Sequence, residues 1–172
     1  PEAGAWQRPR LEQGRAGRYF HKLYAIPEDK LVFVYLGVLT TERGLEVILD
    51  TFADPVVDAH MVFVGYGPLA PQIKSYCDKY PKLHLHEPVP HEQVVPLVAD
   101  ADVGLCLVEG TFLSAFYCLP NKLFEYAFAG LYILGSDLPE IKKVVHDYSL
   151  GVCCTPESQK VLASVQELIA KR

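Results

Sequence analysis

The chain has 172 residues, of which 50% are hydrophobic and 22% charged, and its formal net charge is -5. This length predicts one compact domain, since domains contain about 150 residues, and the composition excludes disordered, collagen-like and mucin-like chains. The acidic balance argues against nonspecific nucleic-acid binding, which depends on clustered lysines and arginines.

The sequence shows no sign of a membrane span or an oxidising compartment. No stretch approaches the roughly 20 consecutive apolar residues of a membrane helix, and the first residues lack the apolar centre of a signal peptide. The five cysteines contain no Cys-x-x-Cys spacing, so we expect neither a disulfide framework nor a zinc knuckle. These features favour a cytoplasmic protein. Because the single methionine is Met61 and the chain opens at Pro1, we also expect a piece of a longer protein.

From Leu31 onward, short apolar runs alternate with segments of helical spacing, whereas residues 1–18 are rich in arginine and glycine and show no such period. We therefore expect residues 1–30 to be an interdomain linker or flexible lead-in, and residues 31–172 to form the folded domain. The expected strands are 31–36, 61–64, 83–86, 103–108, 132–134 and 151–154.

Each run is followed by apolar residues three and four positions apart, as on one face of a helix. Prolines predict the first helical turns, Thr155 predicts a cap for the last helix, and Gly130 predicts a helix end. These prolines are Pro68, Pro120, Pro139 and Pro156.

Strands that are apolar on both faces and separated by helices indicate a parallel sheet covered on both sides. The predicted fold class is therefore α/β, a doubly wound, Rossmann-like parallel sheet of about six strands with helices on both faces. In such folds ligands bind at the carboxyl ends of the strands, so the loops that follow the strands are where a site is expected. The Asp100–Asp102 pair precedes a strand and is expected at the opposite edge.

The loop after the first strand contains Gly37, which lets the backbone approach a ligand, and Arg43, a cation at the start of the next helix. Together these residues suit a phosphate, although a plain turn with a solvated arginine is the simpler alternative for this loop alone. Gly65 and Gly67 follow the second strand rather than the first, and Ala70 stands where a third glycine is expected, so they are a weak dinucleotide-binding motif.

The helix that begins near Pro120 carries the most informative pattern. Its apolar positions, which are Leu123, Phe124, Ala127 and Phe128, are expected to face inward. Asn121, Lys122 and Glu125 would then lie at the edge near the loops, with the Glu125 carboxylate placed to accept two hydrogen bonds from a ribose diol. The amide groups of Asn121 and Lys122 would attract an anion at the positive end of the helix. A merely solvated Glu125 is the alternative.

Here the sequence resembles a known family. The run PNKLFEYAFAGLYILGSDLPEIKKVV is similar to the donor-binding motif of retaining glycosyltransferases of the family 4 type, which have the two-domain GT-B architecture. Three further stretches match in the same order along about residues 31–150: YLGVLTTERGLEVILDTF, FVGYGPL and VPHEQVVPLVADADVGLCL. The resemblance implies the C-terminal, nucleotide-sugar-binding domain of such an enzyme, without its N-terminal acceptor domain.

The resemblance also implies roles for individual residues. Glu125 would bind the donor ribose, the amides of Asn121 and Lys122 would hold the diphosphate, and Gly37 and Arg43 would lie near the phosphates. The base would be contacted by the backbone from Pro88 to His91. The full donor-binding set comprises Gly37, Arg43, Gly65, Pro88, Val89, His91, Tyr117, Asn121, Lys122, Leu123 and Glu125.

Two positions depart from the family pattern. Val38 stands where the family commonly has an arginine, and Tyr117 stands where it often has a glutamate. The departures weaken the expected neutralisation of the diphosphate and the expected sugar contacts, although Lys122 offers a replacement positive charge. A GT-B nucleotide-sugar epimerase and a noncatalytic α/β nucleotide-binding module therefore stay open as alternatives.

The implied reaction is metal-independent hexosyl transfer with retention, from a UDP- or GDP-linked sugar, in polysaccharide biosynthesis. The implied partners are the donor, the missing N-terminal domain and, through that absent half, a peripheral membrane contact. This fragment alone is expected to be inactive. No cofactor or metal site is expected, and His84 and His86, which alternate along one strand, are expected to serve packing or lie at the surface rather than bind metal.

Overall fold

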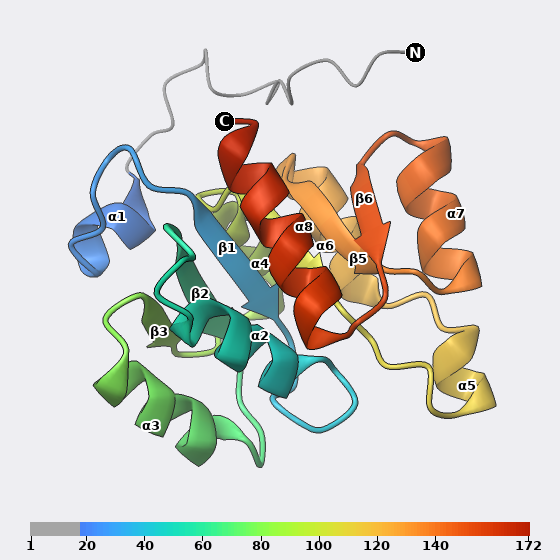
Figure 1. Cartoon of the computed structure of the whole chain (residues 1–172), viewed down its shortest axis with the longest axis horizontal. Helices are drawn as coiled ribbons and strands as arrows, with labels where there is room; N and C mark the ends of the chain where they lie inside the picture. Colours follow the sequence, from blue (N-terminus) through green and yellow to red (C-terminus); the bar gives the residue numbers. More distant parts are fainter. Residues whose placement is uncertain (1–17) are drawn as a thin grey trace.

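The computed structural model describes residues 18–172 and contains one sheet of six parallel strands in the order β3-β2-β1-β4-β5-β6 (Figure 1). The strands are β1 (Val32–Leu36), β2 (His60–Val64), β3 (Leu83–His86), β4 (Val103–Cys106), β5 (Tyr132–Ser136) and β6 (Gly151–Cys154). The helices are α1 (Tyr19–Leu23), α2 (Leu45–Ala53), α3 (Ala70–Lys79), α4 (His91–Val98), α5 (Leu113–Phe116), α6 (Asn121–Ala129), α7 (Pro139–Asp147) and α8 (Ser158–Ala170). The predicted fold class is confirmed.

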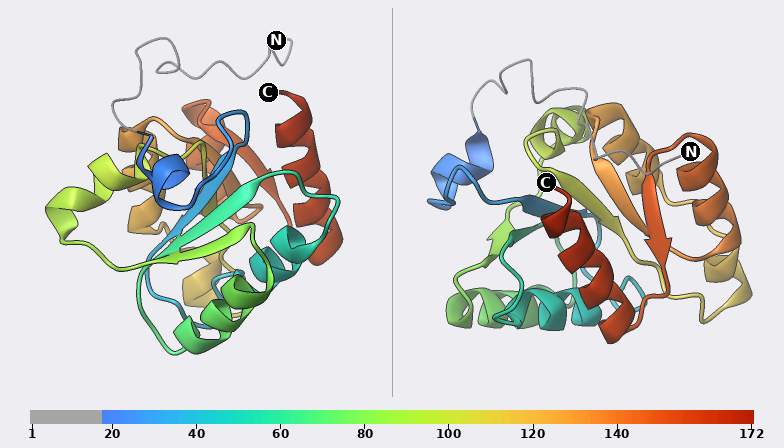
Figure 2. Two further views of the ribbon diagram at one scale, coloured as in Figure 1. Left: turned by 90° about the vertical axis from the view of Figure 1, so that its left-hand side faces the viewer. Right: turned by 45° about the horizontal axis from the view of Figure 1, so that its top comes forward.

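Helices cover both faces of the sheet (Figure 2), and two clusters of buried hydrophobic residues form a core on each side. One core packs α2, α3 and α8 against residues such as Phe33 and Phe63, and the other packs α1, α4, α6 and α7 against residues such as Val34 and Val62. Successive side chains of a strand thus point into opposite cores, which explains why the strands are apolar throughout. In the part of the chain that the structure describes, no helix has both the length and the apolar character needed to cross a membrane.

The folded unit extends back to α1, before the expected start at Leu31. Phe20 of α1 is fully buried, and its backbone amide donates to the Asp100 carboxylate at 2.8 Å. Asp102 accepts a similar bond from the amide of Val32 at 2.7 Å. Both carboxylates therefore lie at the amino ends of the strands, as predicted. The rest of the expected lead-in, residues 1–17, lies outside the described residues.

The histidines near β3 serve packing, as predicted. The His60 and His84 rings lie parallel with a nitrogen–nitrogen distance of 2.9 Å, and Tyr24 stacks on His84 with ring centroids 4.3 Å apart. His86 contacts the hydroxyl of Tyr19 at 3.0 Å. Burial lowers the pKa of His84 to about 4, so this ring is neutral at physiological pH.

The predicted helix boundaries are partly right. Pro139 begins α7, Pro120 immediately precedes α6, and Gly130 ends α6 in the left-handed conformation with φ 73°. Pro68 lies before the first turn of α3, which begins at Ala70. The start of the last helix was predicted wrongly: α8 begins at Ser158, beyond Pro156, and no side chain, including that of Thr155, caps it.

The predicted inward face of α6 is wrong in two positions. Phe124 is 39% exposed and Phe128 is 73% exposed, whereas Leu123, Tyr126 and Ala129 are buried. The buried residues are spaced by three, which shifts the core face away from the two phenylalanines. Tyr126 can occupy the core because its hydroxyl finds hydrogen-bond partners there.

Tyr126 fills the place where β1 and β4 separate. The two strands pair only at Phe33–Val103 and Val34–Gly104. Beyond this point the Tyr126 hydroxyl accepts from the Leu36 amide at 2.9 Å and donates to the Leu105 carbonyl at 3.1 Å. The ring fits because residue 104 is glycine: a Cβ there would lie 2.4 Å from the Tyr126 ring. The side chain thus replaces missing strand–strand bonds.

We expect Tyr126→Phe to lower the free energy of unfolding by about 1–3 kcal/mol, because it leaves the buried Leu36 amide without its partner. Urea denaturation measures the loss. Tyr148→Phe is the matched control, since Tyr148 is 72% exposed and should lose little stability. Equal stability of the Tyr126→Phe variant and the wild type would contradict the bridging role of this hydroxyl.

Candidate functional site

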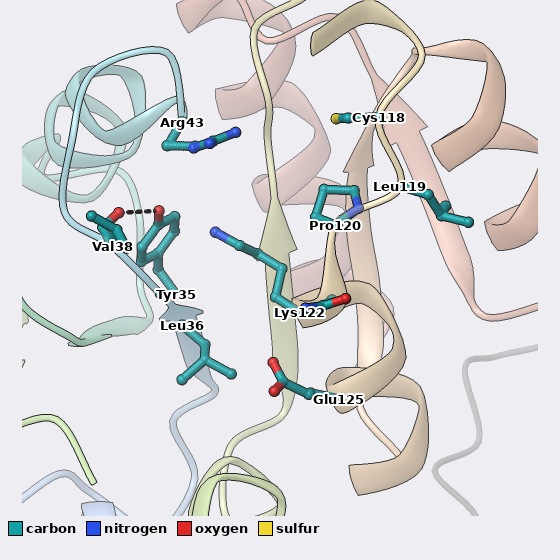
Figure 3. A pocket seen from close by; sticks show the side chains of 11 residues that line it. Tyr35, Leu36, Val38, Arg43, Cys118, Leu119, Pro120, Lys122 and Glu125 are labelled. Carbon is teal, nitrogen blue, oxygen red and sulfur yellow. Dashed lines mark hydrogen bonds between the residues drawn. The ribbon is translucent and has the colours of Figure 1, made fainter. Parts of the chain in front are cut away.

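Two cavities lie at the carboxyl ends of β1 and β4, where the strand order reverses direction. Doubly wound sheets bind ligands at this point. The larger cavity has a volume of about 410 Å³ and is lined by Tyr35, Leu36, Gly37, Val38, Arg43, Cys118, Leu119, Pro120, Asn121, Lys122 and Glu125 (Figure 3). The smaller, of about 210 Å³, is lined by Leu36, Gly37, Val38, Val64, Gly65, Tyr66, Pro88, Val89, Val94 and Glu125. The shared residues make the two cavities adjoining parts of one cleft.

The floor of the cleft depends on two glycines. Gly37 has φ +131°, and a Cβ at this position would lie 3.3 Å from the Lys122 ammonium nitrogen. Gly65 has φ +154°, and its Cβ would lie 1.9 Å from the Gly37 carbonyl oxygen. Gly65 therefore lets the loop after β2 pack against the loop after β1, while Gly37 leaves room for the Lys122 side chain. The Gly37 amide is already used, because it donates to the Val64 carbonyl at 3.0 Å.

The first turn of α6 borders the larger cavity. Pro120 occupies the N-cap position and supplies no side-chain cap to the amides that follow. The Leu123 amide bonds to the Pro120 carbonyl at 3.1 Å, while Asn121 and Lys122 line the cavity. Because the first amides of a helix lack partners within the helix and carry partial positive charge, this end of α6 favours an anion.

Two cations face the same cavity. The Lys122 side chain extends from α6 toward β1, and the Arg43 guanidinium lies above it (Figure 3). Among residues 18–172, neither side chain has a carboxylate within ion-pair distance. Burial lowers the pKa of Lys122 to about 8, and the positive charge of Arg43 contributes to this shift. Within the described residues, the cavity therefore holds two cations that no carboxylate neutralises, which favours an anionic ligand.

Glu125 lies on the same helix edge, at the junction of the two cavities. Its side chain is 20% exposed, and its carboxylate lies 3.9 Å from Nδ1 of His91. The side chain is thus mostly packed while it borders both cavities. This is the arrangement needed for a hydrogen-bond acceptor that faces a ligand from a rigid helix.

Most of the predicted donor-binding residues lie together. Those that line the cleft are Gly37, Arg43, Gly65, Pro88, Val89, Asn121, Lys122 and Glu125. His91 begins α4 instead of lying in the preceding loop, and its side chain is 91% exposed beside Glu125 rather than lining the cleft. Tyr117 is also exposed, next to the cavity-lining Cys118. Leu123 is fully buried, so its side chain belongs to the core and not to the cleft.

Tyr35 lines the cleft, although no sequence motif predicted it there. Tyr35 lies two residues before Gly37 on the expected strand, within a run of apolar residues, so the hydropathy pattern predicts only that it is buried. The available signal was its hydroxyl, because a buried tyrosine near the end of a strand needs a polar partner. In the described range, no cluster of three or more histidine, cysteine, aspartate or glutamate side chains could hold a metal ion.

Comparison with known proteins identifies the family. Residues 30–171 match the family described as glycosyl transferases group 1. The chain belongs to this family. The predicted resemblance to a C-terminal, donor-binding domain of a GT-B enzyme is thereby confirmed. No curated protein sequence matches the chain significantly.

Solved glycosyltransferase structures share the fold at low sequence identity. WaaG, a glycosyltransferase involved in lipopolysaccharide biosynthesis, matches with a TM-score of 0.69 and 13% identity over 97% of this chain and 46% of WaaG. Sucrose-phosphate synthase from Thermosynechococcus elongatus matches with a TM-score of 0.70 and 14% identity over 87% of this chain and 39% of the synthase. Anabaena Alr3699/HepE in complex with UDP matches with a TM-score of 0.69 and 15% identity over 87% of this chain and 41% of HepE. The chain thus spans less than half the length of these proteins.

The Lys122 ammonium, which pairs with no carboxylate among residues 18–172, should cost stability. Its pKa in the folded domain, about 8, lies below the ordinary 10.5, so the charged form opposes folding below pH 8 and the cost declines as the pH rises from 8 to 10.5. We expect Lys122→Met to raise the free energy of unfolding at pH 7 by about 1–2 kcal/mol, with a smaller gain at pH 10. Urea denaturation at both pH values measures this.

Lys160→Met on the exposed surface of α8 is the control and should give no comparable gain. A Lys122→Met variant that is less stable than the wild type at pH 7 would show that the buried ammonium carries no net cost.

Proposed function

We propose that this domain binds a nucleotide-diphosphate sugar, UDP- or GDP-linked, and that the full-length protein transfers the hexosyl group with retention to a glycan, lipid-linked or other acceptor. The observation that carries the proposal is the order of chemical groups along one cleft. An apolar cavity, a carboxylate and two cations follow one another along the cleft. This is the order needed to contact the base, the ribose and the diphosphate of such a donor.

The smaller cavity suits the nucleobase. Its lining is mainly apolar and includes Pro88 and Val89, whose side chains can pack against a base while the backbone supplies hydrogen bonds. Tyr66, which is 67% exposed, lies at the same cavity with its ring accessible to a stacking partner. This arrangement supports the base position predicted from the sequence.

Glu125 is placed to bind the ribose. It borders both cavities, and its carboxylate can accept a hydrogen bond with each oxygen. A ribose between a base in the smaller cavity and a diphosphate in the larger one would meet this carboxylate with its two hydroxyl groups. The nearby His91, 3.9 Å from Glu125, would lie outside the donor at the rim.

The larger cavity suits the diphosphate. The first turn of α6 borders it, and the Lys122 ammonium and the Arg43 guanidinium point into it (Figure 3). Lys122 also reaches the side of Gly37, where Val38 replaces the arginine typical of the family. In the proposed reaction these positive groups stabilise the nucleoside diphosphate as negative charge develops on it during departure, without a metal step.

The remaining parts of the proposal concern the rest of the protein. The sugar would lie beyond the diphosphate, beside Cys118 and Leu119 and near Tyr117. The acceptor would bind to an N-terminal domain of the same protein, so the isolated fragment would bind donor and transfer nothing. A cytoplasmic location, a peripheral membrane contact through that other domain, and a role in polysaccharide biosynthesis complete the proposal.

We expect Glu125→Ala to weaken binding of UDP or GDP by about 1.5–3 kcal/mol, or roughly 10- to 150-fold, because it removes hydrogen bonds to a charged acceptor. Isothermal titration calorimetry with each nucleotide measures the change and also identifies the preferred base. Glu167→Ala, at an exposed position of α8, is the control. Identical affinities of the wild type and Glu125→Ala would remove the ribose assignment.

Donor binding should also depend on pH through Lys122. A bound diphosphate favours the charged ammonium and raises its pKa above the free value of about 8. Affinity is then fully present below pH 8 and falls as the pH rises above 8, by up to about tenfold per unit, because binding must take up a proton. Titrations with UDP between pH 7 and 9.5 test this.

The Lys122→Gln variant supplies the control for this pH series. It has no ammonium, so its weaker affinity should vary with pH only as the nucleotide's own ionisation dictates. A wild-type profile parallel to that of Lys122→Gln would rule out Lys122 as the titrating group.

A further inference from the structure

Tyr35 contacts both sides of the larger cavity, although the comparisons and the sequence pattern give it no role. It is the fourth residue of β1 and is fully buried. The Lys122 ammonium nitrogen lies 3.8 Å from the centroid of its ring, and its hydroxyl donates to the Val38 carbonyl at 2.8 Å (Figure 3). One side chain thus contacts the α6 cation and the loop after β1.

The Lys122 ammonium has few other constraints. Four rotatable bonds separate it from α6, and in the described chain no carboxylate lies within ion-pair distance of it. Gly37 only leaves space, since its Cβ position would lie 3.3 Å from the nitrogen and 3.5 Å from the neighbouring carbon. The face of the Tyr35 ring carries partial negative charge and attracts the ammonium. The ring is therefore the attractive contact that sets where this cation lies.

The hydroxyl of Tyr35 fixes the opposite wall. The peptide between Val38 and Leu39 is held at both ends: its carbonyl accepts from Tyr35 at 2.8 Å, and its amide donates to the Tyr66 carbonyl at 2.8 Å. Burial raises the pKa of Tyr35 well above its ordinary value, so the hydroxyl keeps its proton and remains a donor at any physiological pH. The loop that faces Lys122 consequently has one defined orientation.

We propose that Tyr35 is a positioning residue for the phosphate-binding side of the cleft, whose ring holds the Lys122 ammonium and whose hydroxyl holds the Val38 backbone. This inference rests on the proposed function, since it assigns the positioned cation to the donor diphosphate. Tyr35 itself touches no ligand in this scheme. Its effect on binding passes through Lys122 and the loop after β1.

The two contacts can be separated by substitution. Tyr35→Phe keeps the ring and removes the hydroxyl, whereas Tyr35→Leu removes both. Tyr76→Phe is the control, because it deletes a hydroxyl that bonds to Asp50 on the surface, away from the cleft. Circular dichroism and thermal unfolding establish that each variant of the 172-residue chain is folded before binding is measured.

The first readout is the NMR signal of the Lys122 ε-methylene protons, assigned by its disappearance in Lys122→Gln. Protons close to the face of an aromatic ring shift upfield, so this signal should be displaced in the wild type, in Tyr35→Phe and in Tyr76→Phe. It should return to the position of a free lysine in Tyr35→Leu. This readout needs no ligand and reports the position of the cation, which a general loss of stability would not move.

The second readout is the affinity for UDP and GDP by calorimetry. We expect Tyr35→Leu to lose roughly tenfold or more and Tyr35→Phe to lose less, with Tyr76→Phe unchanged. An unchanged lysine signal or an unchanged affinity in folded Tyr35→Leu overturns the role of the ring. If that variant does not fold, wild-type affinity in Tyr35→Phe overturns the role of the hydroxyl, and an undisplaced lysine signal in the wild type overturns that of the ring. If the wild-type protein binds neither nucleotide, the proposed function itself is overturned. If the wild type binds and the Tyr35 variants bind equally well, only the role of Tyr35 is overturned.

Discussion

The cleft exists because β1 and β4 stop pairing before they end. Their hydrogen-bonded register covers Phe33–Val103 and Val34–Gly104, and beyond it the Tyr126 hydroxyl links the Leu36 amide to the Leu105 carbonyl. An opening in a parallel sheet exposes backbone groups that must find partners, and here one side chain supplies them. Because Tyr126 belongs to α6, the same bonds that close the base of the opening also fix the helix whose edge carries Lys122 and Glu125.

The electrostatics of the cleft favour binding over stability. Lys122 is buried enough for its pKa to fall to about 8, and Arg43 adds positive charge of the same sign nearby. A core optimised for folding would pair such a cation with a carboxylate or replace it with an apolar side chain. In the described part of the chain no carboxylate pairs with it, which keeps its charge available for a ligand, and the attraction of the Tyr35 ring recovers part of the desolvation cost.

The strand order, and hence the position of the cleft between β1 and β4, comes from the structure, whereas sequence periodicity predicted the elements and a site at the carboxyl ends of the strands. It placed Glu125 and the first amides of α6 correctly at the cleft. It failed on which side of α6 faces the core, since Phe124 and Phe128 are hydrophobic yet exposed, while Tyr126 is polar yet buried. Hydrophobicity alone cannot rank these residues, because the burial of Tyr126 depends on partners from two distant strands.

The same limitation explains why the sequence left the effect of Val38 open. A missing arginine after Gly37 removes positive charge from the β1 side of the cleft, but the structure brings the Lys122 ammonium to the side of that glycine from α6. The position of this charge then depends on the distance between α6 and β1. An arginine in the loop after β1 would not depend on that distance, because it would already lie on the β1 side. The hydroxyl of Tyr126 and the ring of Tyr35 both span that distance, so the cationic character of this cleft is a property of the packing between strand and helix rather than of a local motif.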